Sequence, residues 1–260
     1  MMDLAANLST QFDDGAWPER VRRAAAAGFR QVEMQWPYDE CPATDLRRAL
    51  DDHGVRPVLI NAPVGDGDCR MGHASVAGGE GAFRHSVDAA LAYANAIGCP
   101  RIHVLAGLAM DGGARERLLT NLAWAADAAV AAGAGLVIEA INRTDVPEYH
   151  LAGIDDAATV ITDVASDRLG LMFDFYHAHR NGEDAPFLIE RHAGIIRHVQ
   201  ISDHPGRGEP GSGEIDFAPG LAALRAAGYD GAVGCEFRPT GTPEDCLDWA
   251  AGLGFGLAGN

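Results

Sequence analysis

Residues 131–139 read AAGAGLVIE. The run starts with the last turn of an Ala-rich helix, passes through Gly133 and enters a short apolar segment that ends on Glu139. Glycine tolerates the left-handed backbone conformation that commonly ends a helix, so the run predicts a helix, a tight turn and a strand in that order. Similar phrases at 26–29, 96–99 and 226–229 place a glycine at the same kind of junction. The chain therefore reuses one helix-to-strand turn.

The same unit continues in both directions from this run. The candidate strands are 4–8, 31–35, 57–61, 101–105, 136–139, 170–174, 198–201 and 232–236. The candidate helices are 18–27, 44–53, 82–97, 114–132, 154–164, 186–191, 219–226 and 243–251. Alternation of strands and helices implies parallel pairing. Eight units in 260 residues predict an α/β fold, a single (β/α)8 TIM barrel that spans residues 1–260 as one domain.

Composition narrows the class of function. The formal net charge is −17, which disfavours nucleic acid and anionic membranes as partners. No apolar run reaches the roughly 18 residues that span a bilayer, and residues 1–10 lack the basic and apolar segments of a signal peptide. The five cysteines form no CxxC pair, as is typical of reduced thiols in a cytoplasmic protein. We expect a cytoplasmic protein that acts on a small molecule, and a homo-oligomer is left open.

Four consecutive candidate strands carry a polar residue at or near the carboxyl end. They are Glu139, Asp174, Gln200 and Glu236. Strands of a parallel barrel are covered on both faces and should be apolar, and barrel enzymes place their chemistry at the carboxyl ends of the strands. A helix cap or a surface charge explains any one of these residues, but four in succession favour a common site. Three partly buried carboxylates need a countercharge, and oxygen ligands favour a hard divalent cation, Mg2+ or Mn2+ first.

Two further residues are candidates for contacts with a substrate. His177 follows the sixth strand and could bond a substrate oxygen or support a metal ligand. Arg207 lies in the run HPGRGEPGSG at 204–213, and a guanidinium there could clamp a substrate carboxylate. An ordinary surface position is the alternative for each. His103, at the end of the fourth strand, could face the pocket or be a core histidine, whereas His179 is expected to be solvent-exposed.

Longer motifs resemble the hydroxypyruvate isomerase family, within the xylose isomerase-like group of barrels. They are ANLS at 6–9, AGFRQVE at 27–33, WPY at 36–38, IEAIN at 138–142, DFYH at 174–177, HVQISD at 198–203, RGEPGSGEI at 207–215 and GCE at 234–236. The run RGEPGSGE is specific to this isomerase subgroup. The four strand-end residues are shared more widely, including with ketose 3-epimerases. Those epimerases usually carry histidine at the position of Gln200, so the glutamine favours the isomerase.

The resemblance implies a metal-dependent isomerase of carbohydrate and glyoxylate metabolism. Glu139, Asp174, Gln200 and Glu236 would bind one Mg2+ or Mn2+ ion, and the two glutamates would also act as acid and base. The implied reaction interconverts hydroxypyruvate and tartronate semialdehyde, by two-glutamate proton transfer through an enediolate that the metal stabilises. His177 and Arg207 would hold the small keto-acid or sugar-acid substrate.

Other functions on the same barrel are also considered. The run INAP at 60–63 departs from the family pattern beside the pocket, so the alternative is a 2-oxo-tetronate isomerase or a ketose 3-epimerase on the same metal site. A DNA-repair endonuclease of the related barrels would carry more histidines and a surface suited to DNA. A non-catalytic sugar-acid-binding protein would have lost one of the two glutamates, and both are present here.

Overall fold

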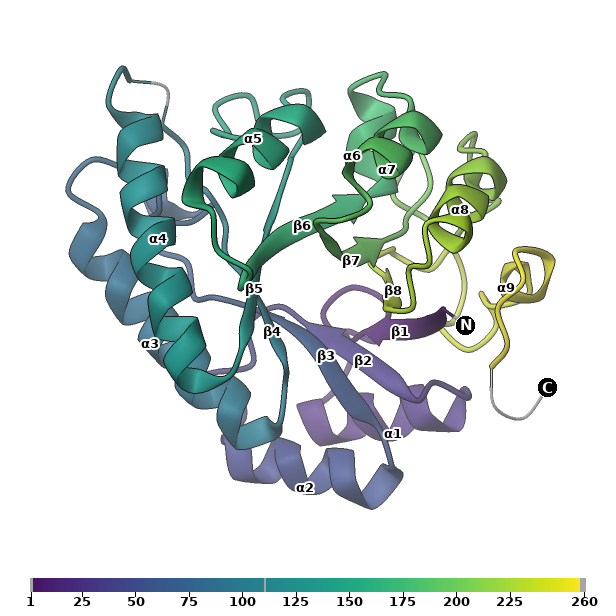
Figure 1. The fold of residues 1–260 in the computed structure, drawn as a ribbon. Helices are drawn as coiled ribbons and strands as arrows, with labels where there is room; N and C mark the ends of the chain where they lie inside the picture. Colours follow the sequence, from purple (N-terminus) through teal and green to yellow (C-terminus); the bar gives the residue numbers. More distant parts are fainter. Residues whose placement is uncertain (1, 110, 258–260) are drawn as a thin grey trace.

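The computed structural model describes residues 2–109 and 111–257, which form a closed barrel of parallel strands (Figure 1). The strands are β1 (Asp3–Asn7), β2 (Gln31–Met34), β3 (Arg56–Asn61), β4 (Arg101–His103), β5 (Gly135–Glu139), β6 (Leu169–Asp174), β7 (Ile196–Gln200) and β8 (Ala232–Cys235). They follow the order of the chain, and β1 pairs with β8 to close the barrel. The predicted TIM barrel is confirmed, and every strand lies within two residues of its expected limits.

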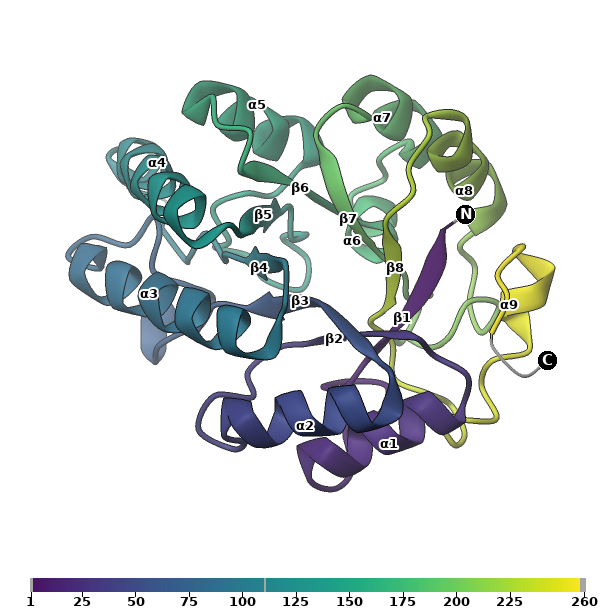
Figure 2. The ribbon, with the colours of Figure 1, turned by 60° about the horizontal axis from the view of Figure 1, so that its bottom comes forward.

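Helices surround the barrel on its outer side, except α6, which directly follows β6 and lies at the carboxyl end of the strands (Figure 2). They are α1 (Trp17–Ala26), α2 (Ala43–His53), α3 (Glu80–Ile97), α4 (Ala114–Ala132), α5 (Ile154–Val164), α6 (Phe175–Arg180), α7 (Ala185–His192), α8 (Phe217–Ala226) and α9 (Trp249–Gly252), with a 3-10 turn at Gly67–Cys69. The turn glycines behave as predicted. Gly98 and Gly133 end α3 and α4 in the left-handed conformation, with φ of 75° and 71°.

The last expected helix, 243–251, is wrong over most of its length. Residues 243–248 form turns, and only Trp249–Gly252 is helical. The Thr242 hydroxyl donates to the Asp245 carboxylate at 2.6 Å, and the Asp245 amide donates back to the Thr242 carbonyl at 3.1 Å. Local bonds of this kind offer the backbone an alternative to a helix, so the apolar spacing alone misplaces the helix start.

The inward-facing side chains of the barrel change from apolar to polar along its axis. Leu59, Val137 and Met172 form a small buried cluster of their own. Because side chains alternate along a strand, Val137 faces the same side as Glu139, and Met172 the same side as Asp174. The apolar cluster therefore closes the barrel beneath a layer of polar residues at the carboxyl ends of the strands.

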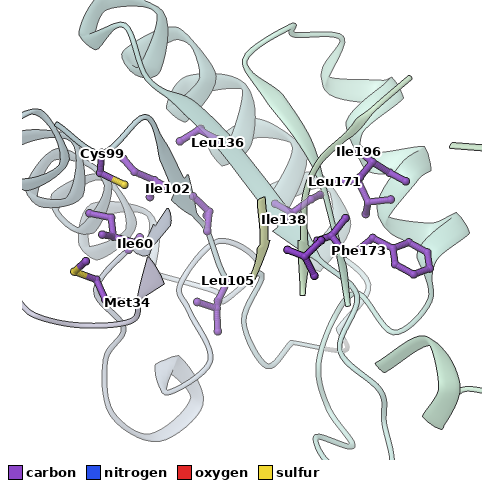
Figure 3. Close-up of a cluster of buried hydrophobic side chains, with 14 of the residues drawn as sticks. Met34, Ile60, Cys99, Ile102, Leu105, Leu136, Ile138, Leu171, Phe173 and Ile196 are labelled. Carbon is purple, nitrogen blue, oxygen red and sulfur yellow. The ribbon is translucent and has the colours of Figure 1, made fainter. Parts of the chain in front are cut away.

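The outward-facing side chains of the strands belong to the main hydrophobic core. Figure 3 shows part of this cluster, with Ile102, Ile138 and Phe173 from β4, β5 and β6. Each is fully buried, and burial of such a side chain contributes about 1.5–3 kcal/mol. The five cysteines are free thiols. Among the described residues, no helix has both the length and the hydropathy to cross a bilayer.

Candidate active site

The four predicted site residues lie at one end of the barrel. Glu139, Asp174 and Gln200 are the last residues of β5, β6 and β7. Glu236 directly follows β8, and its side chain is 12% exposed whereas the other three residues are almost fully buried. The parallel register pairs Asp174 with Gln200 and Gln200 with Gly234, so neighbouring strands deliver these side chains to the same rim. Their expected convergence is present, and their role as metal ligands stays a prediction.

Asp174 has a second task at this rim, because it begins helix α6. The Tyr176 and His177 amides donate to its Oδ1 atom at 2.6 and 3.2 Å. A carboxylate is a favourable N-cap, which explains a short helix that the hydrophobic periodicity does not predict. The cap also turns His177 into the site, where its Nε2 atom lies 3.7 Å from Oε1 of Glu139. Ligand atoms of Glu139, Asp174 and His177 all lie within 4.8 Å of one another.

Burial and like charge disfavour ionisation of the two glutamates. Burial raises the pKa of Glu139 well above its usual range, and the charges of Asp174 and Glu236 raise it further. Burial raises the pKa of Glu236 to about 7, although the charge of Arg207 acts in the opposite direction. Three carboxylates thus compete for limited positive charge, and additional positive charge would stabilise their ionised forms.

Arg207 supplies positive charge at this position. Its Nη2 atom donates to Oε2 of Glu236 at 2.6 Å and to Oδ2 of Asp174 at 3.4 Å. Its guanidinium carbon lies 4.7 Å above the centre of the Tyr176 ring. Burial opposes the charged form, but the charges of Glu236, Asp174 and Glu139 outweigh it and raise the pKa of Arg207. The predicted substrate clamp is therefore in the site, where it is paired with protein carboxylates.

Glu33 of β2 organises the layer beneath the rim, and it is not among the site residues predicted from the sequence. Its Oε1 atom accepts from Nδ2 of Asn7 at 2.8 Å and from Nε2 of Gln200 at 2.9 Å. Its Oε2 atom lies 2.6 Å from Nε2 of His198. A Cβ at Gly234 would collide with this carboxylate, so the glycine of β8 leaves room for it. A charged residue in the middle of the candidate strand 31–35 is the signal that could have revealed Glu33.

The Glu33 network fixes the orientation of the Gln200 side chain. Since the Gln200 amide nitrogen donates to Glu33, its Oε1 atom must point the other way. That oxygen is buried and has no hydrogen-bond partner among the described residues. Gln35, which directly follows β2, donates from its Nε2 atom to Oε1 of Glu236 at 2.8 Å. Both bonds orient carboxylate or amide oxygens that face the rim.

Two buried histidines flank Glu139. The His103 Nε2 atom lies 3.7 Å from Oε2 of Glu139, and burial lowers the pKa of His103 to about 3. The Nδ1 atom of His177 faces the Asn142 side-chain amide at 2.7 Å and the Asn142 backbone amide at 3.3 Å. Both are donors, so Nδ1 accepts and Nε2 carries the proton toward Glu139. The histidine His103, left open between pocket and core, is both buried and part of the site.

The donor set of this rim fits a divalent cation. One guanidinium bonds to Glu236 and Asp174. Glu139 Oε1 and Gln200 Oε1 are both buried without a hydrogen-bond partner among the described residues. Unpaired buried acceptors are costly unless a cation or another donor satisfies them. Oxygen atoms prevail in the set, which suits a hard ion such as Mg2+ or Mn2+. The buried group of Glu139, Asp174 and His177 could thus hold a metal.

The fold and this rim define a class of barrel proteins, and comparisons with known proteins identify the family. The family model described as xylose isomerase-like TIM barrel matches residues 21–254. The chain is 39% identical over 254 residues to a 2-oxo-tetronate isomerase of Cupriavidus necator, covering 96% of this chain and 97% of that protein. It is 36% identical over 254 residues to the hydroxypyruvate isomerase of Escherichia coli, covering 96% and 98%.

A solved structure has the same fold over nearly the whole chain. An AP endonuclease, family 2, from Brucella melitensis superposes with a TM-score of 0.91 at 36% identity and covers 97% of this chain and 99% of that one. The protein belongs to the xylose isomerase-like TIM barrel family. Within it, the chain is an isomerase of the hydroxypyruvate isomerase-like group, as its motifs indicate. The relatives in this group carry two different substrate names.

Proposed function

We propose that this protein is a metal-dependent isomerase that interconverts hydroxypyruvate and tartronate semialdehyde. The observation that carries the proposal is the pair Glu139 and Glu236 at one rim, with Asp174 and the unpaired oxygen of Gln200 beside them. In the reaction, a proton leaves carbon 3 of the hydroxyketone, a proton joins carbon 2, and the proton of the carbon 3 hydroxyl moves to the oxygen on carbon 2. Two carboxyl groups at one site can perform these two transfers in either direction.

The metal is proposed to be held by Glu139, Asp174, Gln200 and Glu236. A divalent cation in this place would polarise the substrate carbonyl and stabilise the negative charge that develops when the carbon-bound proton leaves. Gln200 contributes a neutral oxygen whose direction the Glu33 bond sets. Asp174 keeps one oxygen on the α6 amides and has the other free to turn from Arg207 to a cation.

The remaining residues are proposed to bind and orient the substrate. The guanidinium of Arg207 can exchange its carboxylate partners Glu236 and Asp174 for the carboxylate of the substrate, which it would grip in a two-pronged pair. His177 offers an Nε2 proton beside Glu139 and can donate it to a substrate oxygen. Glu139 is then free to take or return the carbon-bound proton next to that oxygen.

The second candidate is the isomerisation of a 2-oxo-tetronate on the same residues. It is favoured by the relative of Cupriavidus necator that bears this name at 39% identity. The longer acid has one more carbon, so it needs additional space near the segments that follow β3 and β7. A ketose 3-epimerase would use the same rim. Action on DNA fits poorly with a formal net charge of −17.

A substrate panel tests the proposal. Purified protein is treated with a chelator, restored with Mg2+ or Mn2+, and assayed with hydroxypyruvate, 2-oxo-tetronates and ketoses under identical conditions. The expected result is metal-dependent turnover, with the highest kcat/KM for hydroxypyruvate. A higher kcat/KM for a four-carbon acid would replace the substrate and keep the mechanism. Undiminished turnover after complete metal removal would contradict the mechanism itself.

A further inference from the structure

A second group of metal-ligand side chains lies outside the buried rim. His179 belongs to α6, and His204 and Glu214 belong to the segment that follows β7. The Nε2 atom of His179 lies 3.3 Å from Oε1 of Glu214, and the Nε2 atom of His204 lies 3.8 Å from the same oxygen. Ligand atoms of all three residues lie within 4.8 Å of one another. The His179 side chain is 35% exposed, and it is paired with Glu214.

We propose that His179, His204 and Glu214 form a second metal site, specific for a borderline ion such as Zn2+. Two imidazoles and one carboxylate are ligands that zinc takes in proteins, with a water in the fourth position. Bonds of about 2.0 Å in a tetrahedron place neighbouring ligand atoms roughly 3.3 Å apart. The separation of His179 from Glu214, 3.3 Å, already equals that spacing, and the separation of His204 from Glu214, 3.8 Å, is close to it. The buried rim is rich in oxygen, so the two sites prefer different metals.

The backbone that carries two of the three ligands is held in place by hydrogen bonds. The carboxylate of Asp203 accepts from the backbone amides of His204 (2.8 Å), Gly211 (2.8 Å), Gly213 (3.0 Å) and Ile215 (2.9 Å). The Glu214 amide also donates to the His204 carbonyl at 2.7 Å. A backbone fixed in this way reduces the conformational entropy that is lost on binding, which favours affinity.

The position of this second site gives it a consequence for the active site. The segment between His204 and Glu214 carries Arg207, whose guanidinium lies on Tyr176 of α6 and on Glu236. An ion bound by His179 of α6 and by both ends of that segment joins the two elements directly. The bound ion would hold Arg207 over Glu236 and slow its exchange to a substrate carboxylate. The second site therefore acts as a zinc-dependent clamp on the loop that carries Arg207.

The first test is the stoichiometry of Zn2+ binding in excess Mg2+, measured by isothermal titration on the full chain. The variant is His179→Gln/His204→Gln, and the matched control is His192→Gln, which breaks another surface pair, that of His192 with Asp155 at 2.6 Å. The wild type and the control are expected to bind one more equivalent of Zn2+ than the double variant. Glu214→Gln, which keeps both imidazoles, should weaken that equivalent by more than about tenfold. Equal stoichiometry and affinity in the wild type and the double variant would overturn the site.

The second test asks whether Zn2+ bound at this site restrains the loop of residues 204–214. Hydrogen exchange of residues 204–214 is measured in excess Mg2+, with and without micromolar Zn2+. The expected result is slower exchange with Zn2+ in the wild type and in His192→Gln, and no change in His179→Gln/His204→Gln. Binding of the additional Zn2+ without slower exchange would overturn the clamp. Neither readout depends on the substrate, so a failure here is distinguishable from a failure of the proposed isomerase activity.

Discussion

Strands β5 to β8 carry the residues that face the candidate active site, whereas the first half of the barrel carries residues that bond to them. Glu33 of β2 holds Gln200, Gln35 beyond β2 holds Glu236, and His103 of β4 lies against Glu139. Strands β5 to β8 thus supply the carboxyl and amide groups of the site, and residues of β2 to β4 orient these groups. All eight strands have the same βα arrangement, yet the residues that face the site and the residues that orient them come from different halves of the barrel. It predicts a ranking of mutational effects.

The largest effect is expected from Glu139→Gln and Glu236→Gln. An amide cannot exchange a proton with carbon, so each variant should lose on the order of 10²- to 10⁴-fold in kcat at saturating metal. Steady-state kinetics with hydroxypyruvate measure this loss, with Glu116→Gln on the exposed face of α4 as the control. If either variant keeps near-normal turnover, the model of two proton-transferring glutamates is wrong.

An intermediate effect is expected from Glu33→Gln. The new amide has one acceptor oxygen in place of two, so it cannot accept from Asn7, Gln200 and His198 together. The bond that directs the Gln200 oxygen is therefore weakened. Loss of such a supporting bond typically weakens metal binding about 10- to 100-fold. Titration with Mn2+ measures the affinity, and Gly234→Ala, which displaces the same carboxylate, should act in the same direction.

The control for this variant is Glu40→Gln, which alters the bond from the Trp17 side chain. A lower melting temperature of Glu33→Gln with unchanged Mn2+ affinity would assign Glu33 a purely structural task. Recovery of kcat at saturating Mn2+ is expected, because Glu33 acts through Gln200 and does not touch the substrate.

The pH dependence of stability reports on the paired glutamates in metal-free protein. The pKa of Glu236 is raised to about 7 in the folded protein, and that of Glu139 is also raised. The folded state therefore favours their protonated forms. The contribution of these two groups to stability is fully present below the unfolded pKa near 4.5 and is lost as pH rises through about 7. Melting temperatures in chelator should show this decline.

Two comparisons sharpen the pH prediction. Glu236→Gln should flatten the decline between about pH 4.5 and 7, because the amide does not titrate. A divalent cation should raise the melting temperature more at pH 8 than at pH 5, since it binds the ionised carboxylates. A metal-induced shift that is equal at both pH values would contradict a carboxylate site.

The smallest effect is expected from Gln35→Leu. This change removes one hydrogen bond to Glu236 and leaves the carboxyl group in place. The expected cost is about 0.5–1.5 kcal/mol, equal to roughly two- to tenfold in kcat/KM. A loss as large as that of Glu236→Gln would show that Gln35 contributes directly to the reaction. It would contradict the hypothesis that residues of the first half of the barrel only orient the site.

The strand-end residues could be predicted because their signal is local. A charged or amide group at the end of an apolar segment stands out without knowledge of its neighbours, as with Asp174 after the segment 170–173. The segment 243–251 misled the prediction because its spacing suits a helix while Thr242 and Asp245 bond locally. The role of Glu33 could not be predicted because its partner Gln200 lies 167 residues away in the chain.

The amino-acid sequence by itself determined the barrel and the rim at which its polar residues gather. Both follow from short-range rules, namely the turn glycines after each helix and the alternation of side chains along each strand. Only the tertiary structure decided that Arg207 pairs with Glu236, that Glu33 directs Gln200, and that His179 meets Glu214. These contacts join elements whose mutual positions depend on closure of the whole barrel, so no local pattern specifies them.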